Sequence, residues 1–73
     1  MRYENADQLM QLALEMQAAR GGLSLDDISE RFGVSRRTAM RMRDALVRIF
    51  PNLEDFKTDD RIKRWRLPKG TLD

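Results

Sequence analysis

The pattern of apolar and polar positions predicts three helices in the first two thirds of the chain. In each segment the apolar residues recur at helical spacing, so each helix would turn one face toward a shared core. We expect these helices at about residues 5–20, 25–32 and 36–50, with inward faces formed by Leu9, Leu12, Ala13 and Met16, by Leu25, Ile28, Ser29 and Phe32, and by Ala39, Met42, Leu46, Ile49 and Phe50.

Capping and breaking residues bound the first two segments. Asn5 is expected to cap the first helix, and the glycine pair 21–22 to end it. Ser24 is expected to cap the second helix, because Asp27 follows three residues later in a form of the capping box. These signals predict a short connection between the first two helices.

The second and third helices are separated by a tight turn. Gly33 permits a left-handed backbone, Val34 would fill the angle between the helices, and Ser35 is expected to cap the third helix. Ser29 is small enough for the two helices to cross closely, and Pro51 would stop the third helix. This spacing is typical of a helix-turn-helix unit.

The pattern changes to that of a β-hairpin after the third helix. Residues 53–56 are a candidate strand, residues 57–60 a turn, and residues 61–67 a second strand. Ile62 does not fit the alternation of the second strand. Three helices followed by a wing at about residues 53–67 predict a single, mainly α domain with the winged helix-turn-helix fold.

Trp65 and Leu67 would share the inner face of the second strand, with Arg64 and Arg66 on its outer face. A tryptophan can stack on the bases of a single strand. One aromatic residue that faces inward in a small domain is more typical of a core. The chain has no other aromatic platform and no glycine-rich clamp of the kind that binds RNA, so RNA is not favoured as the partner.

Positive charge is concentrated in two segments, although the formal net charge is only +2. Residues 35–50 hold five arginines and one aspartate, and residues 57–70 hold six basic residues and two aspartates. The rest of the chain is acidic. Such segments can be ordinary solvated surface, but together with helix-turn-helix spacing they favour a face that binds a polyanion.

The first turns of the third helix are the predicted reader of base edges. Arginine fits the two major-groove acceptors of guanine, so we expect Arg36, Arg37 and Arg41 to contact bases. Met40 would either contact a thymine methyl group or simply be exposed. Phosphate contacts are expected from Ser35, Thr38, Lys57, Arg61, Lys63 and Arg64, and flanking or backbone contacts from Arg43 and Arg48.

The chain has no cysteine and no histidine, which excludes thiolate and imidazole metal sites and Cys- or His-based catalysis. The paired acids at 26–27 and 59–60 suit a helix start and a turn, so no enzyme activity, cofactor or small-molecule site is expected. The polar N-terminus lacks the apolar stretch of a signal peptide, and no apolar run is long enough to span a membrane. A cytoplasmic protein with no membrane partner is expected.

The segment LSLDDISERFGVSRRT, residues 23–38, resembles the N-terminal winged helix of bacterial WYL-domain transcriptional regulators, within the DeoR-like group. The segment KRWRLP, residues 63–68, is similar to the second wing strand of that family. Two departures stand out, because Ser29 replaces the usual alanine and Met42 replaces the aspartate that usually follows Arg41. The resemblance implies that this chain is the first domain of a longer regulator, with a WYL domain after it.

Two functions remain open from the sequence. The favoured one is sequence-specific binding of double-stranded DNA by a transcription regulator, with a homodimer of the full-length protein on paired half-sites. The alternative is a winged-helix module that binds another protein through its acidic first helix and the exposed side chains of Met10, Leu14 and Met40.

Overall fold

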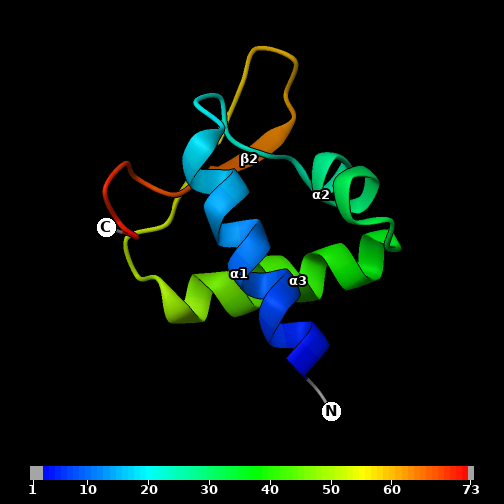
Figure 1. The fold of residues 1–73 in the computed structure, drawn as a ribbon. Helices are drawn as coiled ribbons and strands as arrows, with labels where there is room; N and C mark the ends of the chain where they lie inside the picture. Colours follow the sequence, from blue (N-terminus) through cyan, green and yellow to red (C-terminus); the bar gives the residue numbers. More distant parts are fainter. Residues whose placement is uncertain (1–2, 73) are drawn as a thin grey trace.

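The computed structural model describes residues 3–72, with side chains described from Ala6 onward. Helix α1 crosses α3, α2 lies near one end of α3, and the hairpin lies at the C-terminal end of α1, away from the N-terminus (Figure 1). Three helices and a two-stranded wing make this a winged helix-turn-helix fold, as predicted. The elements are α1 (Tyr3–Ala18), α2 (Leu25–Phe32), α3 (Arg36–Ile49), β1 (Glu54–Lys57) and β2 (Lys63–Arg66).

The core lies where α1, α2, α3 and β2 meet. All three predicted helical faces contribute to it, but Ile49 is 55% exposed and was wrongly assigned to the core. The N-terminal part of α1 leaves a hollow of about 200 Å³ beside the end of α3, and Ile49 borders this hollow. The buried apolar residues are Leu12, Ala13, Met16, Leu23, Ile28, Ala39, Met42, Leu46, Trp65 and Leu67.

The predicted ends of α1 differ from the observed ones, whereas α2 begins and ends as predicted. Asn5 lies inside α1 and does not cap it, because the helix already begins at Tyr3. The helix ends two residues before the predicted end at residue 20. Ser24 caps α2: its hydroxyl accepts the N–H of Asp27 at 3.1 Å, and the Asp27 carboxylate accepts the N–H of Ser24 at 3.0 Å.

The turn between α2 and α3 has the predicted helix-turn-helix geometry. Gly33 adopts a left-handed conformation, with φ 63° and ψ 39°. The hydroxyl of Ser29 donates a hydrogen bond to the carbonyl oxygen of Val34, so this small residue also fastens the turn. Ser35 caps α3 by accepting the N–H of Thr38 at 3.1 Å. These contacts fix the start of α3 relative to α2.

The wing is an antiparallel pair in which Glu54 faces Arg66 and Lys57 faces Lys63. Its strands cover residues 54–57 and 63–66, so the predicted strands at 53–56 and 61–67 and the predicted turn at 57–60 all differ from the observed bounds. The turn spans residues 58–62. The N–H of Ile62 donates to the Asp60 carboxylate at 3.0 Å, so this N–H does not pair with β1 and Ile62 stays outside β2.

The connection between α1 and α2 also joins the wing. Leu23 forms a β-bridge with Trp65, with N–H to carbonyl distances of 2.8 and 2.9 Å. Gly22 precedes it at φ 77°, and a Cβ there would lie 2.9 Å from the carbonyl oxygen of Trp65. Glycine is therefore required for this close approach. The bridge anchors strand β2 of the wing to the helical core.

Candidate nucleic-acid interface

Helix α3 presents one exposed face on the side away from the core. Successive residues rotate by about 100° around a helix, which places Arg37, Asp44 and Arg48 opposite the buried Ala39, Met42 and Leu46. Met40 and Arg41 flank this line, and Met40 is 41% exposed. We call this set the outward face of α3. It consists of Arg37, Met40, Arg41, Asp44 and Arg48.

The first turn of α3 has donors available for an acceptor. The N–H of Thr38 is bound by the Ser35 hydroxyl, whereas the N–H groups of Arg36 and Arg37 have no hydrogen-bond partner within residues 3–72. Free N–H groups at a helix N-terminus suit a phosphate oxygen. The start of α3 therefore offers donors from its main chain and its side chains.

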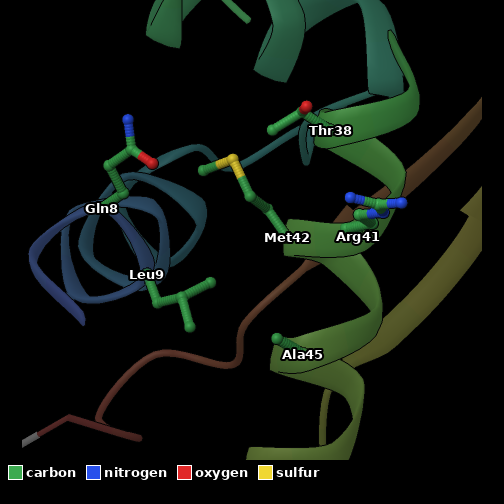
Figure 2. A pocket seen from close by; sticks show the side chains of 6 residues that line it. All are labelled: Gln8, Leu9, Thr38, Arg41, Met42 and Ala45. Carbon is green, nitrogen blue, oxygen red and sulfur yellow. The ribbon is translucent and has the colours of Figure 1, made fainter. Parts of the chain in front are cut away.

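Thr38 lies on the side of α3 that is turned toward α1, and it is half-buried. A hollow of about 280 Å³ lies between the two helices. Figure 2 shows the Thr38 side chain beside it, with Arg41 at its border. Of the predicted contacts on α3, Thr38 is thus set back from the outward face. The hollow is lined by Gln8, Leu9, Thr38, Arg41, Met42 and Ala45.

A groove of about 230 Å³ separates the start of α3 from the wing. Arg36 lines it from α3, while Arg61 and Lys63 line it from the wing. The structure therefore brings together three cations that are up to 27 positions apart in the sequence. The groove is lined by Ser24, Leu25, Asp26, Arg36, Arg61, Ile62, Lys63 and Trp65.

Two of the groove cations have exposed acidic partners. Arg36 Nη1 lies 2.6 Å from Asp26 Oδ1, and Lys63 Nζ lies 3.1 Å from Asp55 Oδ2. Exposed pairs of this kind contribute about 0–1 kcal/mol, so a phosphate can replace either acid at small cost. Among the side chains of residues 6–72, no ion-pair partner is present for Arg37, Arg41, Arg48, Lys57 and Arg61.

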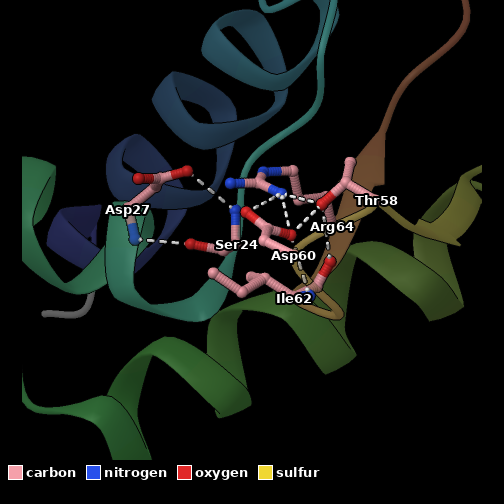
Figure 3. A network of polar contacts seen from close by, with 6 residues as sticks. All are labelled: Ser24, Asp27, Thr58, Asp60, Ile62 and Arg64. Atoms are coloured by element: carbon pink, nitrogen blue, oxygen red, sulfur yellow. Dashed lines mark hydrogen bonds and ion pairs between the residues drawn. The ribbon is translucent and has the colours of Figure 1, made fainter.

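Arg64 belongs to the wing turn more than to the exposed surface. Figure 3 shows its guanidinium beside Asp60 and Thr58, with Nη1 3.3 Å from Asp60 Oδ1, and its side chain is 22% exposed. The Thr58 hydroxyl, the N–H of Ile62 and Arg64 lower the pKa of the Asp60 carboxyl to about 2. Arg64 thus holds the turn that presents Arg61.

Arg43 connects α3 to the wing, a contact that sequence reasoning missed. Its guanidinium lies 4.6 Å from the centre of the Trp65 ring, and its side chain is only 16% exposed. The helical spacing does place Arg43 at the border of the buried face, between Ala39 and Leu46. Trp65 is 7% exposed, which confirms it as a core residue and leaves it no open face for a base.

Fold and surface together define the class, a winged helix-turn-helix domain with cations on α3 and the wing. A comparison with protein-family models finds none that matches the chain, and a comparison with curated proteins finds no match. The resemblance to WYL-domain regulators therefore stays a prediction from residues 23–38 and 63–68. Across residues 3–72, no helix is both long enough and apolar enough to cross a membrane.

Proposed function

We propose that this chain binds double-stranded DNA as the DNA-binding domain of a bacterial, cytoplasmic transcription regulator related to the WYL-domain family. The observation that carries the proposal is the groove that Arg36 of α3 shares with Arg61 and Lys63 of the wing. It brings a cation at the start of α3 beside two cations of the wing, from segments that are distant in the sequence. A duplex that fills its major groove with α3 would meet the wing at its backbone or minor groove.

The positions of the cations assign different roles to them. Arg37 and Arg41 belong to the outward face of α3 and are the proposed contacts to base edges. Arg36 borders the wing groove, which favours a phosphate contact over the base contact expected from the sequence. The other proposed phosphate contacts are Ser35, Lys57, Arg61 and Lys63.

One domain of this size buries too little surface for tight, specific binding to a single half-site. We therefore propose that the full-length protein acts as a homodimer on two half-sites, since dimer symmetry is then matched by the symmetry of the operator. The proposed role needs neither a cofactor nor catalysis, because binding alone would control access to the DNA.

The salt dependence of duplex binding tests this function. If each protomer neutralises about four or five phosphates, a plot of log K against log salt concentration has a slope near −4. Arg37→Ala should weaken binding, whereas Arg20→Ala, in the loop after α1, should leave it almost unchanged. A slope near zero, or equal losses in the two variants, would contradict the proposal.

Exposed apolar side chains favour one alternative, a module that binds another protein. Met10 is 55% and Leu14 47% exposed on α1, and Met10 also lines the hollow of about 200 Å³ beside Ile49. A protein partner would cover these two residues of α1, whereas Met40, the third apolar residue of this alternative, lies on the outward face of α3. The two functions thus differ in whether α1 or the cations of α3 and the wing make the main contact.

A further inference from the structure

An acidic side chain lies in the middle of the basic outward face of α3. Asp44 is 56% exposed and shares this face with Arg37, Arg41 and Arg48. A carboxylate there opposes any nearby phosphate and weakens binding that depends on charge alone. The position of Asp44 is therefore unfavourable for binding DNA through charge alone. A carboxylate at this position can favour DNA binding only by accepting a hydrogen bond from a donor on the DNA.

The carboxylate of Asp44 is held by Arg43, whose guanidinium packs on Trp65 of the wing. Arg43 Nε donates to Asp44 Oδ1 at 2.7 Å, and the same guanidinium is stacked on Trp65 at 4.6 Å. The side chain of Arg43 is 16% exposed, so this support is largely shielded from solvent. No hydrogen bond from residues 6–72 reaches the second oxygen, Oδ2, which is thus available to a donor outside the protein.

The donors on base edges in the major groove are exocyclic amino groups. Adenine presents its N6 amino group beside the N7 acceptor, which would repel a carboxylate and suits an amide better. Guanine presents two acceptors, whereas cytosine presents its N4 amino group alone. A fixed carboxylate on a helix in the major groove is therefore matched best by cytosine.

We propose that Asp44 is a specificity-determining residue that accepts a hydrogen bond from the N4 amino group of a cytosine in the DNA site. The assignment rests on the proposed function. Arg43 and Trp65 act as positioning residues, since they hold the carboxylate without touching the base. Specificity at this base pair would then depend on the contact between α3 and the wing.

Selection of bound duplexes from a random pool, followed by sequencing, tests the assignment. The wild-type protein should enrich cytosine at one position, and replacing that base pair should weaken binding about five- to tenfold. Asp44→Ala should lose the preference at that position and keep the others, while binding unselected duplexes more tightly because one negative charge is gone. Asp7→Ala, the same charge change at an exposed site on α1, should keep the complete wild-type motif.

Asp44→Asn provides a gain of specificity that misfolding cannot mimic. With its oxygen kept on Arg43 Nε, the asparagine presents an N–H donor where Asp44 presents an acceptor, so the preferred base should change from cytosine to one with an acceptor there, adenine through N7 or guanine through N7 and O6. An unchanged motif in both Asp44 variants, or a wild-type preference for adenine there, would overturn the assignment while leaving DNA binding intact. A wild-type protein that binds no duplex would overturn the proposed function and the assignment together.

Discussion

The guanidinium of Arg43 lies 4.6 Å from the centre of the Trp65 ring and joins helix α3 to wing strand β2. The amino group of Lys63 lies 6.0 Å from the same ring. One buried tryptophan is thus the contact between the two basic parts of the proposed DNA surface. This contact adds to the Leu23–Trp65 bridge, which anchors β2 to the helical core.

Replacing Arg43 by leucine should lower the free energy of unfolding by about 0.5–2 kcal/mol, because the cation–π contact with Trp65 is lost while an apolar side chain remains. Urea denaturation followed by Trp65 fluorescence measures the change. Arg48→Leu is the matched control on the exposed side of α3 and should change stability by less than about 0.5 kcal/mol. Equal effects of the two substitutions would show that the stacking does not stabilise the domain.

Gly22→Ala should destabilise the domain by roughly 2–4 kcal/mol. The added Cβ would meet the Trp65 carbonyl oxygen at 2.9 Å, and an alanine at φ 77° is strained in addition. Gly21→Ala adds the same methyl group where nothing lies within 4 Å of it, so thermal unfolding should show little change. Comparable melting temperatures for the two variants would refute the close approach at Gly22.

Asp60 should give the wing turn a dependence on acidic pH. Its pKa lies near 2 in the folded protein, below its ordinary value of 3.8, so the turn is stabilised above about pH 4 and loses that stabilisation as the pH falls toward 2. An NMR titration of the Asp60 carboxyl carbon should have its midpoint near 2. A midpoint near 3.8 would mean that the hydrogen bonds from Thr58 and Ile62 do not favour the charged form.

Arg61→Gly should affect stability and DNA binding in opposite directions. Arg61 has a left-handed backbone, with φ 65°, which glycine adopts without strain. Stability should therefore stay the same or rise by up to about 1 kcal/mol, while affinity for a duplex falls because a wing cation is lost. Calorimetric unfolding and fluorescence anisotropy measure the two effects. Lower stability together with unchanged affinity would contradict both the left-handed backbone at Arg61 and its contact with DNA.

The helix-turn-helix unit could be predicted from the sequence because its signals are local. Ser24 with Asp27, Gly33 and Ser35 act within a few residues of their own positions, and each has the predicted role. The alternation of apolar and basic residues in the second wing strand was also sufficient to predict that Trp65 lies in the core. These features depend on backbone preferences and on burial of one face, which a short segment already specifies.

Features that depend on contacts between elements could not be predicted in the same way. Ile49 fits the helical period, but its burial depends on where α1 crosses α3. The ends of the wing strands depend on the hydrogen bonds of Asp60, and the role of Arg43 depends on the wing folding back onto α3. An arginine count could not separate a cation that stacks on Trp65 from those that remain exposed, such as Arg37.

The proposed DNA surface is tested most directly by an NMR titration of the isotope-labelled protein with a mixed-sequence duplex. We predict that amide signals shift along residues 35–48, from the N-cap through α3, and along residues 57–64 of the wing, while those on the exposed side of α1 around Met10 and Leu14 stay in place. Shifts confined to α1, with α3 and the wing unaffected, would contradict the proposed DNA surface.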